Sequence, residues 1–264
     1  MPIEAAPLSC GRRAARGHEG QPMFIFAYGV GAYVIFLLTF LYAIGFVENW
    51  IVSLTIDGAI GGVDTGGGVA AWIGNVFLLA LFALQHSIMA RPAFKRSWTR
   101  IVPPAAERST YVLVSSVTLM LVFARWKPIP TVLFDFGPNP LSFLVEILSF
   151  AGWAIVLLAT IQIDHFELFG LKQVFLHARG EELPPPKFHT PFFYRYVRHP
   201  IYTGFLLAFW STPRMTLGHL LFAVMITGYI LVAIRLEEDD LSNAHWEYRG
   251  YRARVPMLWP IKLK

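Results

Sequence analysis

The stretch FIFAYGVGAYVIFLLTFLYAIGFV, residues 24–47, contains no charged residue. A helix of about two dozen residues is long enough to cross roughly 30 Å of hydrocarbon. Similar apolar runs recur along the chain, so we expect an all-α, polytopic membrane helix bundle with five to six membrane segments. The segments are expected at about 24–47, 69–89, 109–126, 141–163, 200–212 and 216–236.

The last two segments differ from the others because the run that starts at residue 200 is too short to cross a membrane alone. The letters STPRMT, residues 211–216, separate it from the final run. A proline in this connection favours a turn over a continuous helix. We therefore expect the two segments to form a helical hairpin.

The composition is typical of a membrane protein. Of the 264 residues, 55% are hydrophobic and 15% are charged, whereas a soluble domain carries about 25% charged residues. Cys10 is the single cysteine, which excludes an intrachain disulfide framework, and no metal site is predicted. The formal net charge of +5 comes from basic residues that lie beside apolar runs, so we expect the lipid bilayer as a partner and no nucleic acid.

The positions of lysine and arginine indicate the orientation in the membrane, since these residues are retained on the cytoplasmic side. The loop 90–110 and the segment 164–198 carry five each, whereas the loop 48–68 carries none. This alternation predicts six crossings with both termini in the cytoplasm, or five if the hairpin is re-entrant or the third segment is interfacial. The protein is thus expected in a bacterial-type cytoplasmic membrane.

The chain is expected to consist of a tail and one membrane domain. Residues 1–22 are polar, small and basic and are predicted to be a disordered tail. Residues 23–264 are predicted to form a single domain, whose polar segments 164–198 and 237–264 meet in a cytoplasmic cap.

Three groups of polar residues adjoin the membrane segments, where polar side chains are costly. They are IQIDHFELFGLKQ at 161–173, YRYVRHPIYTGF at 194–205, and RLEEDDL at 235–241 followed by EYRGYRARVP at 247–256. Each has an ordinary structural interpretation: basic residues anchor the topology, a histidine bonds a helix end, and acids form a solvated face. No group alone decides between these interpretations and a ligand site.

The combination of the second and third groups favours a ligand site. Pro200 suits the first turn of a helix, Tyr202 lies three residues beyond His199 on the same face, and Gly204 has no side chain one turn later. Such a helix end offers free N–H groups, cations and an aromatic wall to a ligand that carries a carboxylate. The other helix of the hairpin adds two acceptors for ribose hydroxyls or an ammonium group, Glu237 and Glu238.

Three motifs in a fixed order resemble the C-terminal signature of the isoprenylcysteine carboxyl methyltransferase superfamily: RHPIYTG at 198–204, LEEDDL at 236–241 and YRGYRARVP at 248–256. This superfamily consists of integral-membrane enzymes that use S-adenosyl-L-methionine. IDHFELFGLKQV at 163–174 is similar to its methanethiol S-methyltransferase branch, and that likeness covers roughly residues 23–262. It implies methylation of methanethiol to dimethyl sulfide, with the active site on the cytoplasmic side.

The resemblance also implies which residues bind the cofactor. In one place the sequence departs from the family: His245 and Trp246 stand where the family has Phe-Gly before the first cap tyrosine, which puts the local turn in question. The residues expected to bind the cofactor are Arg198, His199, Tyr202, Gly204, Glu237, Glu238, Tyr248, Tyr251 and Arg252.

The acceptor in such a reaction is a small-molecule thiol, which attacks poorly until it loses its proton. His165 is the first candidate base, with Asp164 orienting it, and His189 is a second. Alternatively, alignment of donor and acceptor in a water-poor pocket supplies most of the acceleration without a base.

Other functions are also compatible with the sequence. One is a methyltransferase of the same superfamily that acts on another thiol or on a lipid-linked carboxylate, which a wide lateral opening would favour. A second is a non-enzymatic membrane protein that binds haem or a quinone through His86, His165 or His199. A third is a reductase of similar hairpin architecture. The sequence leaves the oligomeric state undetermined.

Overall fold

The computed structural model describes residues 21–59, 67–184 and 188–260. Of the predicted tail, residues 1–20 lie outside the described residues, whereas Gln21 and Pro22 already belong to the first helix. The helices are α1 (Gln21–Val47), α2 (Val69–Ala90), α3 (Pro92–Trp98), α4 (Pro104–Arg125), α5 (Pro140–Gln162), α6 (His165–Leu168), α7 (Leu171–Ala178), the 3-10 helix η1 (Phe192–Arg195), α8 (Pro200–Trp210), α9 (Leu217–Ala244) and α10 (Trp246–Arg254). The strands are β1 (Leu54–Thr55), β2 (Gly58–Ala59), β3 (Val132–Asp135) and β4 (Arg214–Thr216).

The predicted fold class, an all-α polytopic membrane bundle, is confirmed. Five helices of the described chain, α1, α2, α4, α5 and α9, are long and apolar enough to cross a membrane. Helix α8 has 11 residues, which corresponds to about 16 Å and is too short to cross alone. It is followed by α9, as expected for the hairpin.

Two helices extend beyond the membrane segments predicted for them. Helix α4 begins at Pro104, five residues before the expected start, because proline is well tolerated at the first helical position. Helix α9 runs to Ala244 rather than ending near residue 236. Glu237 and Glu238 therefore lie on the long apolar helix itself and not in a separate cap.

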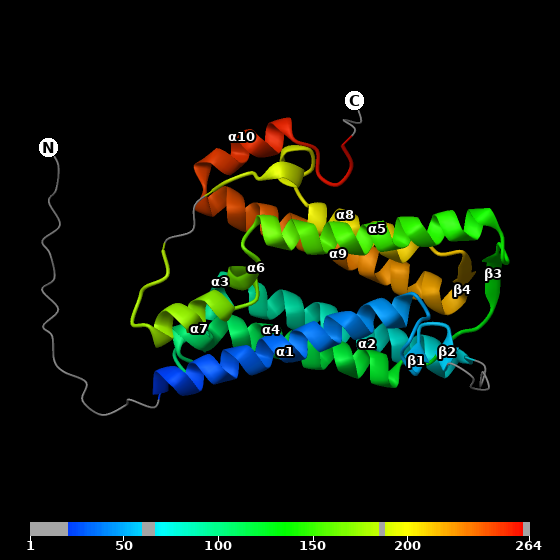
Figure 1. Ribbon diagram of the computed structural model, residues 1–264, viewed down its shortest axis with the longest axis horizontal. Helices are drawn as coiled ribbons and strands as arrows, with labels where there is room; N and C mark the ends of the chain where they lie inside the picture. The colour runs from blue at the N-terminus through cyan, green and yellow to red at the C-terminus, as the bar shows by residue number, and fades with distance from the viewer. Residues whose placement is uncertain (1–20, 60–66, 185–187, 261–264) are drawn as a thin grey trace, which may run out of the picture.

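The helices form two layers (Figure 1). Helices α5, α8 and α9 lie on one side and α1, α2 and α4 on the other, while α3, α6, α7 and α10 gather at one end of the bundle. The opposite end carries both strand pairs, β1 with β2 and β3 with β4, each antiparallel. The pairing of β3 with β4 ties the α4–α5 connection to the turn of the hairpin.

Aromatic rings fill the space between the two layers. Trp153 of α5 meets Phe40 of α1 edge-on, with 5.6 Å between ring centroids, and also contacts Phe209 of α8 at 5.7 Å. Phe46 at the end of α1 contacts Phe222 of α9 at 6.2 Å. Tilted and edge-on pairs of this kind stabilise a core beyond the area that they bury, so they fix how the layers face each other.

Helices α5 and α8 approach closely through two glycines. A methyl group on Gly204 would lie 2.6 Å from the carbonyl oxygen of Gly152, and one on Gly152 would lie 2.6 Å from the nitrogen of Ala208. Small residues allow such backbone contact between membrane helices. The missing side chain at Gly204, which we had expected to make room for the cofactor, thus makes room for α5.

Substituting Gly204 by alanine should therefore destabilise the protein. We expect a loss of about 1–3 kcal/mol from overpacking, seen as a lower midpoint of thermal unfolding in detergent. Gly228 of α9 has open space around the position of an added methyl group, so Gly228→Ala serves as the matched control and should not lower the midpoint. Equal midpoints for the two variants would show that the α5–α8 contact contributes little.

Candidate functional site

The buried carboxylate of Glu238 is the centre of one polar cluster. Its Oε1 accepts hydrogen bonds from Nε of Arg198 at 2.6 Å and pairs with Nε2 of His199 at 3.0 Å. Its Oε2 lies 3.0 Å from Nε of Arg252 on α10. Two guanidinium groups and an imidazole thus compensate one carboxylate, a geometry that makes its burial tolerable.

Arg198 also forms hydrogen bonds with the backbone of residues 252–256, which follow or end α10. Its Nη1 donates to the carbonyl oxygens of Arg252 and Val255, and its backbone N–H donates to the carbonyl of Pro256 at 2.9 Å. The N–H of His199 donates to the carbonyl of Met257 at 3.1 Å. Two of the N–H groups that we had expected to face a ligand carboxylate are therefore paired with the chain itself.

The acidic pair divides into two different environments. The side chain of Glu238 is 3% exposed, whereas that of Glu237 is 44% exposed. Glu237 Oε2 accepts a hydrogen bond from the hydroxyl of Tyr202 at 3.1 Å and lies 3.9 Å from Nδ1 of His199. Glu238 thus holds the local structure together, and Glu237 presents a carboxylate that a ligand can reach.

The two predicted cap tyrosines lie inside the protein. Tyr251 donates a hydrogen bond to the carbonyl of Tyr194 at 2.5 Å, and the ring of Phe188 packs against Tyr251 and Tyr248. Burial raises the pKa of Tyr251 to about 12, so this phenol stays neutral. Both tyrosines are placed to hold α10 against the loop that precedes α8.

The connection between α9 and α10, where the sequence departs from the family pattern, consists of a single residue. Helix α9 ends at Ala244 and α10 begins at Trp246, and His245 alone connects them in an extended conformation. Trp246 is 80% exposed. The unusual residues therefore do not displace Tyr248, which still lies buried one turn further on.

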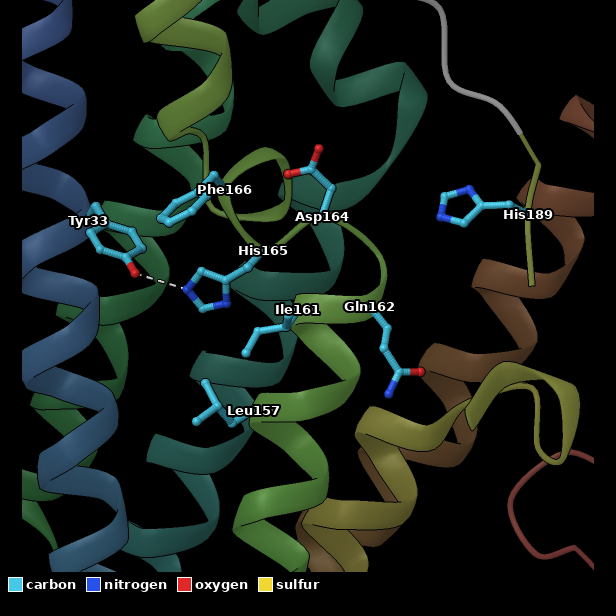
Figure 2. Close-up of a pocket in the computed structure, with 8 residues that line it drawn as sticks. All are labelled: Tyr33, Leu157, Ile161, Gln162, Asp164, His165, Phe166 and His189. Carbon is cyan, nitrogen blue, oxygen red and sulfur yellow. Dashed lines mark hydrogen bonds between the residues drawn. The ribbon is translucent and has the colours of Figure 1, made fainter. Parts of the chain in front are cut away.

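A second cluster lines a pocket of about 750 Å³ (Figure 2). The pocket brings together all three predicted catalytic residues, from the α5–α6 connection, α6 and the segment before η1, and adds Tyr33 from α1. Its lining residues are Tyr33, Leu157, Ile161, Gln162, Asp164, His165, Phe166 and His189.

The imidazole of His165 is held by two hydroxyl groups. Its Nε2 lies 2.9 Å from the hydroxyl of Tyr33, and its Nδ1 lies 2.9 Å from the hydroxyl of Thr160. The ring of Phe169 packs against it at 4.8 Å. Burial lowers the pKa of His165, and the charge of Asp164 opposes this only in part. The ring is therefore neutral at neutral pH and can accept a proton.

The prediction that Asp164 orients His165 was wrong. The Asp164 carboxylate caps α6, accepting from the N–H of Glu167 at 3.0 Å, and forms an ion pair with Lys172 at 2.6 Å. Burial acts to raise the pKa of Asp164, but the hydrogen bonds and charge of Lys172 leave it lowered. The backbone of Asp164 has φ of 77°, so the chain turns sharply at this residue. The side chains of Asp164 and His165 therefore point in different directions (Figure 2).

His189 lies on the other side of the pocket from Tyr33 (Figure 2) and is exposed. Close by, Gln162 at the end of α5 accepts a hydrogen bond from the N–H of Phe193 at 2.9 Å, which ties the start of η1 to the pocket. The structure thus places His189 at the rim, where it stays a second candidate base.

The histidines proposed for haem or quinone binding are all engaged by protein groups. Both ring nitrogens of His86 lie near hydroxyls, Nε2 at 2.7 Å from Tyr111 and Nδ1 at 3.1 Å from Ser115. His165 and His199 have the partners given above. Among residues 21–59, 67–184 and 188–260, no cluster of potential ligands could hold a metal ion.

Tyr33 and Thr160 were missed in the sequence. Each lies inside a long apolar helix, and the contact between Tyr33 and His165 joins residues 132 positions apart. A polar side chain at membrane depth is a signal for function, but it does not identify its partner. The sequence shows both hydroxyl-bearing residues but does not indicate that they contact His165.

Comparison with known proteins finds close relatives across most of the chain. The chain is 52% identical over 236 residues to methanethiol S-methyltransferase 1 of Bradyrhizobium diazoefficiens, covering 89% of this chain and 81% of that protein. It is 50% identical over 234 residues to methanethiol S-methyltransferase of Mycobacterium tuberculosis, covering 88% and 94%. Human Nurim is 29% identical over 229 residues, covering 78% and 87%. No family model and no solved structure matches.

Proposed function

The chain belongs to the methanethiol S-methyltransferase family, and from this premise we propose that it transfers a methyl group from S-adenosyl-L-methionine to methanethiol and releases dimethyl sulfide. The observation that carries the proposal is the pocket with a neutral histidine at its wall, which suits a small acceptor that must lose a proton. The other candidate base, His189, lies at the rim of the same pocket.

The residues near the start of α8 fit a cationic cofactor that carries ribose and amino-acid groups. Glu237 offers a reachable carboxylate to ribose hydroxyls or an ammonium group, and Tyr202 holds that carboxylate from the other helix of the hairpin. Arg198, His199 and Arg252 support this arrangement through the buried Glu238. Five of the expected cofactor residues thus act by positioning a sixth, Glu237.

The chain's part in the chemistry is to prepare the thiol. S-adenosyl-L-methionine, when bound, supplies a methyl group on a positively charged sulfur. His165 accepts the thiol proton, because burial lowers its pKa and so leaves the ring unprotonated and available as an acceptor at neutral pH. The thiolate then forms the new S–CH₃ bond while the old one breaks, with its electron pair going to the departing sulfur. The apolar walls, Leu157 and Ile161, keep water away from the thiolate.

The site is proposed to face the cytoplasm. The basic segments of residues 90–110, 164–184 and 188–198 lie at the same end of the bundle as α10 (Figure 1). Positive charge near membrane segments is retained on the cytoplasmic side. A charged cofactor would then reach Glu237 from the cytoplasm, while an apolar thiol can also arrive through the bilayer.

One observation favours a second acceptor, a lipid-linked carboxylate or a longer thiol. Leu157, Ile161 and Phe166 line the pocket and are exposed. An apolar rim of this kind would let a lipid chain extend from the pocket into the bilayer. Offering the enzyme N-acetyl-S-farnesylcysteine beside methanethiol distinguishes the two acceptors.

A single experiment tests the function. Purified protein in detergent is given methanethiol and S-adenosyl-L-methionine with a deuterated methyl group, and the headspace is analysed by gas chromatography and mass spectrometry. We expect dimethyl sulfide that carries the deuterated methyl. Failure to form it, with folded protein that binds the cofactor, would refute methanethiol as acceptor, and methylation of the farnesylated substrate alone would support the lipid-linked alternative.

Substituting Glu237 by glutamine should weaken cofactor binding without unfolding the protein. Hydrogen bonds to charged groups contribute about 1.5–3 kcal/mol, so we expect Kd to rise about 10- to 100-fold in isothermal titration calorimetry. Glu247 lies exposed on α10, and Glu247→Gln is the matched control with an unchanged Kd. If Glu237→Gln also leaves Kd unchanged, the cofactor is held elsewhere.

A further inference from the structure

We propose that Tyr33 is a catalytic residue, whose hydroxyl oxygen takes the proton of the thiol while its own proton passes to Nε2 of His165. The inference rests on the proposed function and names the group that meets the acceptor. Neither the C-terminal motifs nor the stretch around His165 contains Tyr33, which lies in α1.

The hydroxyl of Tyr33 meets the imidazole of His165 at the wall of the pocket. Its oxygen lies 2.9 Å from Nε2 of His165, and the two rings are nearly perpendicular, at 84° with centroids 5.8 Å apart. Both residues line the pocket, and the ring of Phe166 packs against Tyr33 at 6.3 Å. Figure 2 shows the tyrosine pointing across from α1 toward the imidazole.

Thr160 sets which ring nitrogen of His165 carries the proton. Its hydroxyl has one hydrogen, and a carbonyl acceptor, that of Leu157, lies 2.7 Å away. The hydroxyl donates there, so at its 2.9 Å contact with Nδ1 it acts as the acceptor. The ring proton is then on Nδ1, and Nε2 is left with a lone pair that accepts from Tyr33.

This arrangement leaves the thiol no direct route to the imidazole. Nδ1 faces Thr160 on α5, and Nε2 is occupied by the hydroxyl of Tyr33. A phenol oxygen that donates its own proton can still accept one. Tyr33 is therefore the group through which a thiol in the pocket reaches the base.

The proton transfer balances without a further reactant. The S–H bond of the thiol breaks and an O–H bond forms on Tyr33, while the original O–H bond of Tyr33 breaks and an N–H bond forms at Nε2. The result is a thiolate, a neutral tyrosine and an imidazolium ion. After methyl transfer the extra proton returns by the same route: it passes from Nε2 to the oxygen of Tyr33, while the hydroxyl proton of Tyr33 passes to water in the pocket.

The decisive test compares two thiols of different acidity. Tyr33→Phe should lower kcat about 10- to 100-fold with ethanethiol, a loss typical of general acid–base catalysis. With 2,2,2-trifluoroethanethiol, which ionises much more readily, the same variant should lose little, because the proton transfer that Tyr33 assists is no longer limiting. Tyr28→Phe is the matched control, since Tyr28 lies on the same helix and bonds Thr110 of α4.

Each outcome of this comparison decides something. Equal losses with both thiols would show a structural role and overturn the proposal, as would full activity of Tyr33→Phe with ethanethiol. If the wild-type enzyme methylates none of ethanethiol, 2,2,2-trifluoroethanethiol and methanethiol, the proposed function itself is refuted. The two failures are therefore distinguishable in one set of assays.

A second measurement tests the relay without cofactor. In cofactor-free protein with ¹⁵N-labelled histidine, the chemical shifts of His165 should show the proton on Nδ1 and a hydrogen-bonded lone pair on Nε2. Thr160→Val should admit the other tautomer and lower kcat with KM unchanged. Thr160→Ser keeps the hydroxyl, so it should show the wild-type tautomer and the wild-type kcat. A proton on Nε2 in the wild type would overturn the proposed direction of transfer.

Discussion

Replacing His165 by alanine is expected to lower kcat for methanethiol by about 10²- to 10⁴-fold, the usual contribution of a positioned base. The variant removes the acceptor for the thiol proton and leaves the Tyr33 hydroxyl without its partner. Because His165 lies in α6 and Glu237 lies in α9, the Kd for S-adenosyl-L-methionine should be unchanged. Single-turnover rates measured by dimethyl sulfide release, beside calorimetric Kd values, separate the two effects.

Two other histidines serve as comparisons for this variant. His177 is exposed on α7, so His177→Ala should keep full kcat. His189→Ala reports on the second candidate base at the rim of the pocket. If His189→Ala shows the large loss in kcat and His165→Ala does not, the base has been assigned to the wrong side of the pocket.

Substituting Glu238 by alanine is expected to cost about 3–5 kcal/mol of stability, the penalty for leaving buried charges without their partner. Arg198, His199 and Arg252 all lose their shared acceptor. With Arg198 released, its contacts with the carbonyls of Arg252 and Val255 should loosen as well. We expect a strongly lowered unfolding midpoint in detergent and no measurable cofactor binding.

The neighbouring acid provides the matched control. Asp239 is 72% exposed and its Oδ1 lies 4.0 Å from Nη1 of Arg252. An exposed ion pair contributes about 0–1 kcal/mol, so Asp239→Asn should shift the unfolding midpoint little and leave Kd unchanged. Similar midpoints for the Glu238 and Asp239 variants would mean that the buried cluster is not what holds α10 to α8.

Much of the fold could be predicted because membrane segments are specified by local composition. The free energy of placing each residue in hydrocarbon depends on that residue and its near neighbours, so the expected segments match α1, α2 and α5 to within a few residues. The hairpin of α8 and α9 could be predicted for the same reason. The end of α9 was missed because Glu237 and Glu238 read as the start of a polar cap, whereas their partners allow the helix to continue.

The candidate site was predicted unevenly. The residues that the motifs marked do converge, since Arg198, His199 and Arg252 all meet at Glu238. Their individual roles did not follow from the motifs. Gly204 allows the close approach of α8 to α5. Asp164 forms an ion pair with Lys172 and does not bond His165.

The sequence by itself determined that this protein is a helical membrane protein, which of its segments are long enough to span, and which short motifs carry its polar groups. Those properties are local, because hydropathy and motif spacing depend on residues close together in the chain. Only the tertiary structure decided that Glu238 is enclosed while Glu237 is reachable, and that Tyr33 meets His165 across 132 residues. These depend on how each helix is rotated and which layer it joins, and many distant side chains determine that packing together.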